Sequence, residues 1–154
     1  MLTTNAMTPT ITFFLKWIKD ASPDVQPGII MTDRNQDQIA ALQSIYPQSW
    51  VLLCTWHVLC VMQSHFATNQ FLELWDKVKA WVKSNKMADF LNLWDEISTN
   101  PSVPQSFVQY LAKEWLQSPY MWARVARKNQ SIFEEGETNM LIEAYVISRF
   151  LMIR

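Results

Sequence analysis

The sequence predicts a helix-rich α/β fold with two short parallel strands, and three observations lead to this prediction. Residues 29–31 and 50–54 are brief apolar runs with the length of buried strands rather than of helices. Apolar residues at helical spacing precede, separate and follow these runs, a pattern typical of parallel strands joined by a helical crossover. From Asn69 onward, every apolar stripe has helical spacing.

The first half of the chain alternates helices and strands. Three helices are expected there, and their apolar positions are Ile11, Phe14, Leu15 and Ile18; Ile39, Leu42 and Ile45; and Val58, Val61 and Met62. Ser22-Pro23 ends the first helix, because proline cannot continue the helical hydrogen bonds. The second helix ends near Pro47, and the first strand stops at Thr32-Asp33.

The second half is predicted to be helical throughout. Its stripes are Phe71, Trp75, Val78, Trp81 and Val82; Met87, Phe90, Leu91, Trp94 and Ile97; Phe107, Leu111 and Trp115; and a short helix with Trp122 and Val125. Gly136 breaks the chain before a final helix. The eight tryptophans predict large aromatic packing contacts.

Composition excludes several classes of protein. The 154 residues are enough for one domain with a core, and 49% of them are apolar, which argues against disorder. Only two glycines are present, too few for a typical phosphate-binding loop. The charge is nearly balanced, with 13 basic against 14 acidic residues, so the whole chain gives no nucleic-acid signal. The apolar run 140–153 is too short to span a bilayer, and a soluble intracellular protein without a membrane partner is expected.

Asp33 directly follows the first predicted strand. Ligands in open α/β sheets gather beyond the carboxyl ends of parallel strands, so a carboxylate there is well placed to bind a metal ion. Asp33 with Gln36 three residues later also resembles a capping box at a helix start. Both interpretations, ligand and cap, are consistent with the spacing.

Cys54 and His57 close the second predicted strand, and with Cys60 and His65 they make four candidate zinc ligands. Their spacing matches no common zinc motif, and on a helix His57 and His65 would differ by about 80° in direction. The alternative is that Cys54 and His57 form a buried structural pair. Cys54 and Cys60 are poorly placed to bridge each other.

Glu143 lies in an almost wholly apolar segment with no basic residue within one helical turn. A carboxylate there requires a cation, a metal ion or a proton. Thr138 or Asn139 would cap this helix. Arg124, Arg127 and Lys128 form a basic cluster beside Trp122 that suits either Glu143 or DNA phosphates, although a solvated helix face also explains it.

Several of these motifs occur in a fixed order. They are residues 30–34 (Ile-Met-Thr-Asp-Arg), Ala41-Leu42, Tyr46-Pro47, residues 53–58 (Leu-Cys-Thr-Trp-His-Val), Trp122 with Arg124, Arg127 and Lys128, and residues 138–144 (Thr-Asn-Met-Leu-Ile-Glu-Ala). Their order, spacing and strand context resemble the Mutator-like element (MULE) transposase domain of fungal type. The resemblance runs from about Ile11 to Tyr145.

The resemblance implies a partial RNase H-like fold interrupted by a helical insertion. A single truncated domain, 1–154, would comprise a partial core at 11–67, the insertion at 69–128 and a C-terminal core helix at 138–154. Asp33 and Glu143 would match the second and third carboxylates of a catalytic Asp-Asp-Glu set that binds Mg²⁺, with DNA as partner and the nucleus as location. Cys54, His57, Thr138 and Asn139 would be motif residues.

The sequence also departs from the family. The first catalytic Asp of the family belongs to a strand that would precede Ile11, so the chain resembles an N-terminally truncated and inactive domain. A second hypothesis is a domesticated DNA- or protein-binding protein without catalysis, and a third is the zinc-binding module. A fourth is a truncated gene copy without a selected function.

Overall fold

The computed structural model describes residues 8–66 and 71–127. The chain divides into two compact units with their boundary between Leu53 and Cys54. The described part of unit 1 is therefore 8–53, and that of unit 2 is 54–66 with 71–127. Helices predominate and a small parallel sheet is present, as predicted.

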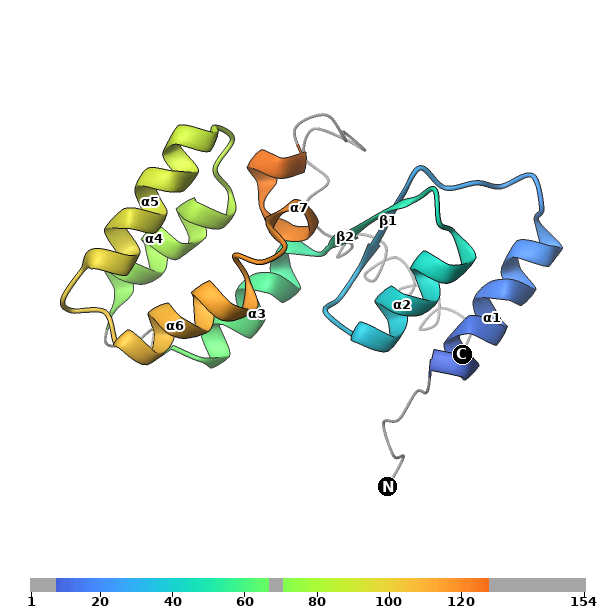
Figure 1. Cartoon of the computed structure of the whole chain (residues 1–154), viewed down its shortest axis with the longest axis horizontal. Coiled ribbons are helices and arrows are strands. Elements are labelled where there is room, and N and C mark those ends of the chain that lie inside the picture. The colour runs from blue at the N-terminus through green and yellow to red at the C-terminus, as the bar shows by residue number, and fades with distance from the viewer. Residues whose placement is uncertain (1–7, 67–70, 128–154) are drawn as a thin grey trace, which may run out of the picture. The chain divides into compact units, whose positions relative to one another are not determined.

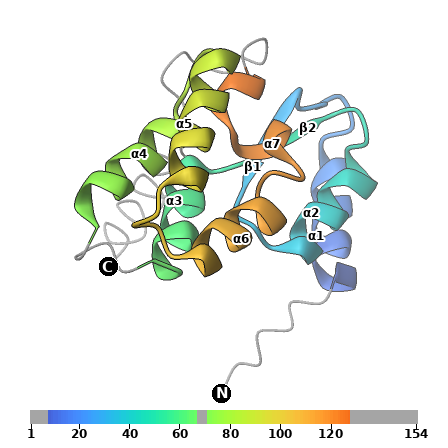
Figure 2. The same cartoon turned by 60° about the vertical axis from the view of Figure 1, so that its left-hand side comes forward.

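Unit 1 is built around a strand–helix–strand motif. Helix α1 (Thr8–Ala21) is followed by β1 (Ile29–Thr32), α2 (Gln36–Ile45) and β2 (Trp50–Leu53). The two strands pair in parallel with Ile29 opposite Trp50 and Thr32 opposite Leu53, as the sequence predicted. Helices α1 and α2 pack side by side (Figures 1 and 2).

Polar contacts fasten the connections of unit 1. The Lys19 ammonium donates a 2.6 Å hydrogen bond to the Ile45 carbonyl at the end of α2 and lies 5.3 Å from the centroid of the Tyr46 ring. A cation is favourable at that position because the last carbonyls of a helix carry partial negative charge. The Ser49 hydroxyl donates to the Pro27 carbonyl and so links the segments that precede the two strands. These bonds hold α1 against α2 and fix where each strand begins.

The core of unit 1 lies between α2 and β2. Ile39, Ala41 and Leu42 are buried on α2, and the last three residues of β2 are buried as well. The predicted apolar stripe of α1 is only partly buried: Ile11 and Leu15 are half-buried, whereas Phe14 and Ile18 are exposed. The predicted helix is confirmed, but only part of its apolar stripe is packed.

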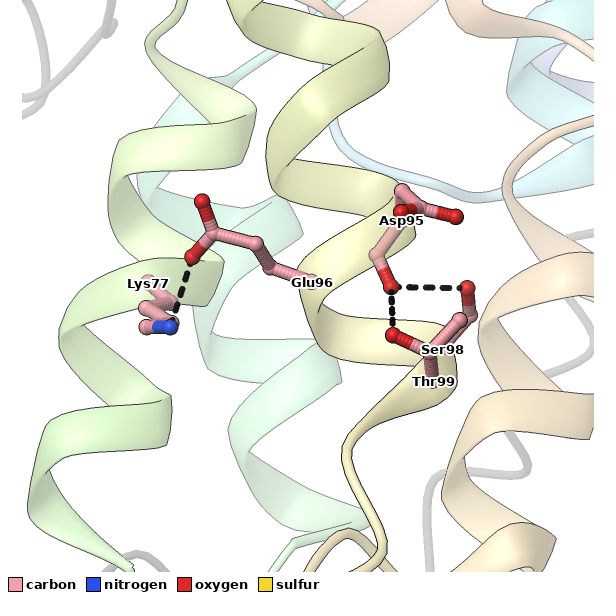
Figure 3. Close-up of polar contacts among 5 residues, drawn as sticks. All are labelled: Lys77, Asp95, Glu96, Ser98 and Thr99. Atoms are coloured by element: carbon pink, nitrogen blue, oxygen red, sulfur yellow. Dashed lines mark hydrogen bonds and ion pairs between the residues drawn. The ribbon is translucent and has the colours of Figure 1, made fainter.

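Unit 2 is helical. It contains α3 (Thr55–Ser64), α4 (Leu72–Val82), α5 (Met87–Thr99), α6 (Gln105–Glu114), α7 (Pro119–Trp122) and the 3₁₀ helix η2 (Arg124–Arg127). Helices α4 and α5 pack against each other, and Lys77 and Glu96 form an ion pair of 2.6 Å between them (Figure 3). The hydroxyls of Ser98 and Thr99 bond to the Asp95 carbonyl in the last turn of α5.

An aromatic cluster forms the centre of unit 2. The Trp81 ring lies 5.2 Å from Phe90, 5.3 Å from Trp94 and 4.9 Å from Trp122, measured between centroids. Trp122 also packs edge-on against Trp115 and donates its indole N–H to the Trp115 carbonyl at 2.9 Å. Trp81, Trp115 and Trp122 are almost completely buried. The large aromatic contacts predicted from the tryptophan content are confirmed.

A second aromatic group joins α3 to α6. Phe66 stacks on Phe107 with 4.6 Å between centroids, and His65 stacks on Tyr110 at 4.0 Å.

Within residues 8–66 and 71–127, no helix is both long and apolar enough to cross a membrane.

Candidate functional site

Asp33 is exposed immediately beyond the end of β1. The backbone N–H of Asn35 donates to Asp33 Oδ1 at 3.1 Å, which closes a tight turn between β1 and α2. Among the described residues, nothing donates a hydrogen bond to the second carboxylate oxygen. One oxygen of Asp33 is therefore held by the backbone while the other is free to take a ligand.

Asn35 caps α2, and the capping role considered for Asp33 was wrong. Asn35 Oδ1 accepts the backbone N–H of Gln38 at 3.0 Å, and the backbone of Asn35 is extended, as at a helix N-cap. The Thr32 hydroxyl bonds to Gln38 Oε1 at 2.6 Å and ties the end of β1 to the first turn of α2. Asn35 with Gln38 three residues later has the same capping-box spacing as Asp33 with Gln36, so the spacing alone did not distinguish the two.

Several predicted site residues lie outside the described parts of the chain. They are Lys128, Thr138, Asn139 and Glu143. The proximity of Glu143 to Asp33 stays a prediction, as does the cap at Thr138 or Asn139.

Cys54 and His57 stand at the start of α3. Cys54 is completely buried at the N-cap position, but its side chain makes no capping hydrogen bond. His57 is half-buried and packs edge-on against Trp56 with 4.7 Å between ring centroids. Its Nδ1 is buried and has no hydrogen-bond partner within the described part of the chain, so this nitrogen does not bond to the Cys54 thiol. Burial of Cys54 agrees with a structural role.

The zinc hypothesis is not supported. Cys54 and Cys60 are both free thiols, and His65 stacks on Tyr110 at the other end of α3. Across residues 8–66 and 71–127, no group of three or more His, Cys, Asp or Glu side chains is placed to hold a metal ion. The candidate ligands therefore do not converge, because a ten-residue helix spreads them along its length and around its circumference.

The basic cluster is partly committed to structure. Arg124 and Arg127 lie on η2 and are half-buried. The Arg127 guanidinium donates to the Met121 carbonyl at 2.9 Å. Trp122 is buried in the aromatic cluster and is therefore not available to stack on a nucleic-acid base.

No family model, curated protein or solved structure matches this chain. The assignment of function therefore rests on the residues themselves: an exposed carboxylate at the end of a parallel strand, a buried Cys and half-buried His at the next strand end, and one half-buried arginine pair. Of these, Asp33 is the exposed carboxylate at the carboxyl end of a parallel strand, the edge at which open α/β sheets generally bind ligands.

Proposed function

We propose that this chain is a transposase-derived domain with an RNase H-like core, in which Asp33 and Glu143 face one divalent metal ion. The position of Asp33 supports the proposal most directly. Its carboxylate is exposed beyond the carboxyl end of β1, next to the parallel strand β2. This edge is where open α/β sheets bind their ligands.

The donor atoms suit Mg²⁺ or Mn²⁺, which prefer carboxylate oxygens. Asp33 would supply one ligand, and its N–H bond from Asn35 restrains the carboxylate before the ion binds. Glu143, the third carboxylate by resemblance, would supply another. A bound ion of this kind would polarise a phosphoryl oxygen and favour deprotonation of a coordinated water.

Two carboxylates hold an ion weakly, and the described residues provide no group of three candidate ligands. We therefore propose that the 154-residue chain by itself retains the metal-binding pair but does not cleave DNA. In this proposal Glu143 is a metal ligand and no complete catalytic set is required.

A plasmid-nicking assay in Mg²⁺ or Mn²⁺ tests the absence of catalysis. We expect the wild-type chain and Asp33→Ala to convert supercoiled DNA at the same background rate. Efficient cleavage that disappears in Asp33→Ala would contradict the proposed lack of catalysis but would agree with a metal site at Asp33. Efficient cleavage that survives in a highly purified Asp33→Ala variant would contradict the site as well.

Non-catalytic binding to DNA or protein is the second candidate function, and the two arginines on η2 favour it. Both belong to one four-residue helix, so they occupy a single short stretch of surface. Arg127 is bonded to the Met121 carbonyl, and we expect both arginines to contribute to any phosphate contact.

Fluorescence anisotropy with a labelled DNA duplex at increasing salt tests this candidate. Arg124→Ala should lower the slope of log affinity against log salt by about one, as expected for the loss of a phosphate contact. Lys113→Ala is a matched control, since Lys113 is a highly exposed cation of unit 2 whose nearest acid, Glu114, is 4.0 Å away. If anisotropy shows no DNA binding even at low salt, DNA binding is eliminated as a function and protein binding is the candidate that is left.

A further inference from the structure

Helix α1 presents an apolar surface away from α2. Phe13, Phe14, Trp17 and Ile18 are 74%, 58%, 60% and 38% exposed, and together they are called the aromatic face below. At 100° per residue these four positions fall within about 140° of the helix circumference. Leu15 and Lys19 lie outside this arc, about 60° and 100° beyond Ile18, and Lys19 bonds there to the end of α2. Half-buried Ile11 lies only about 20° beyond Ile18. Among the described residues, one side of the helix thus packs in unit 1 and the aromatic face stays exposed.

Such a surface needs an explanation. Contiguous exposed apolar patches on single proteins usually mark interaction sites. The rings of Phe14 and Trp17 stack with 6.1 Å between their centroids, so the aromatic face is preassembled on the helix. Burying two or three large aromatic side chains is a strong driving force for association.

The charges beside the aromatic face indicate what covers it. Lys16 and Asp20 are exposed, four residues apart, and lie along the edge of the face next to Phe13. When two copies of a helix pack antiparallel about a twofold axis, the same edge of each helix meets the other in reverse order. Lys16 then meets Asp20 of the second copy, and Asp20 meets Lys16. A parallel arrangement would instead bring this edge against the other edge of the face, where Ile11 and Ile18 lie, so the charges would not pair.

Side-chain size agrees with the same register. If the twofold axis passes level with residues 17 and 18, Phe14 lies opposite the small Ala21 of the second copy, and Trp17 lies opposite Ile18. Lys16 and Asp20 of the two copies then differ by only about 1.5 Å in height along the helix axis. A single register therefore places a large side chain opposite a small one and a basic side chain near an acidic one.

We propose that the aromatic face of α1 is a homodimer interface, formed by antiparallel packing of α1 against α1 of a second copy. The interface depends on described residues of unit 1 and is independent of metal binding or catalysis. A single helix pair is a small interface, so we expect a reversible dimer with a dissociation constant on the order of micromolar.

Sedimentation equilibrium over a wide concentration range, with far-UV circular dichroism as a folding control, tests the proposal. Lys16→Glu and Asp20→Lys should each raise the dimer dissociation constant about tenfold, because each replaces two attractions by two repulsions. The double variant Lys16→Glu/Asp20→Lys restores opposite charges in the antiparallel register and should return to within about threefold of wild type. Trp17→Ala should weaken the dimer about thirtyfold or more. Lys86→Glu, with the same change in net charge on an exposed lysine of unit 2, should have no effect.

Cysteine cross-linking provides a second measurement that does not require any large side chain to be removed. Ile18→Cys places a thiol near the twofold axis and should form a dimeric disulfide on mild oxidation, whereas Thr10→Cys should not. The wild-type chain, with buried Cys54 and half-buried Cys60, is the reference. A monomer at every concentration would overturn the proposal and point to cover by another part of the chain, such as residues 140–153, or by a different protein. A dimer insensitive to Lys16→Glu would also overturn it.

Discussion

Two polar side chains at the start of α2, Asp33 and Asn35, have different partners and therefore different expected roles. Asn35 accepts a helix N–H and satisfies one of the donors that the first turn leaves unpaired. Among residues 8–66 and 71–127, Asp33 accepts the Asn35 N–H alone, and it remains exposed. Stability should thus depend mainly on Asn35, and ligand binding on Asp33.

Substitution separates these roles. Asn35→Ala should lower the free energy of unfolding by about 0.5–2 kcal/mol, the usual cost of losing an N-cap. Asp33→Asn keeps an oxygen that accepts the Asn35 N–H and should cost less than about 0.5 kcal/mol. Urea denaturation followed by circular dichroism measures both, and a larger loss for Asp33→Asn would contradict the assignment of the cap.

At the scale of elements, apolar contacts rather than ion pairs hold α4 against α5. The Lys77–Glu96 pair is short, but its side chains are 42% and 52% exposed, and water weakens such pairs (Figure 3). Ile97, the neighbouring residue on α5, is completely buried. The ring of Trp81 on α4 stacks on Phe90 and Trp94 of α5, so aromatic contacts join the two helices.

Substitutions of the adjacent residues Glu96 and Ile97 compare the contribution of an ion pair to stability with that of a buried apolar side chain. Glu96→Gln should change the free energy of unfolding by no more than about 1 kcal/mol, with a smaller effect at high salt. Ile97→Ala should cost about 2–5 kcal/mol, because it leaves a cavity in a buried contact. Denaturation of the two variants at low and high salt checks this, and an equal loss for both would show that the ion pair matters more than its exposure suggests.

Most elements could be predicted from the sequence because their apolar periodicity is strong and proline or polar residues mark their ends. The two strands and the helices of 71–127 are examples. The burial of α1 could not be predicted, since its apolar residues cover more than one side and only tertiary structure decides which side is packed. At the site, the sequence placed Asp33 correctly at a strand end, but two competing Asx residues obscured which one caps α2.

At the scale of the whole molecule, the two units differ in how they are stabilised. Most of the buried apolar side chains among the described residues belong to unit 2, where the tryptophans cluster. Unit 1 has a two-stranded sheet, a smaller core and the exposed aromatic face of α1. The proposed metal ligand Asp33 and the proposed dimer interface both belong to unit 1, so ligands and partners should stabilise this unit more than unit 2.

The central claim is that Asp33 and Glu143 share one divalent ion, and an Mn²⁺ titration followed by electron paramagnetic resonance tests it most directly. We expect Asp33→Asn and Glu143→Gln each to weaken Mn²⁺ binding about tenfold or more, and the double variant to be little weaker than either single variant, because one lost ligand already disrupts a shared site. Asp24→Asn, an exposed acid of the same unit, should bind like wild type. Wild-type affinity in Glu143→Gln, or independent losses that add in the double variant, would contradict a shared site.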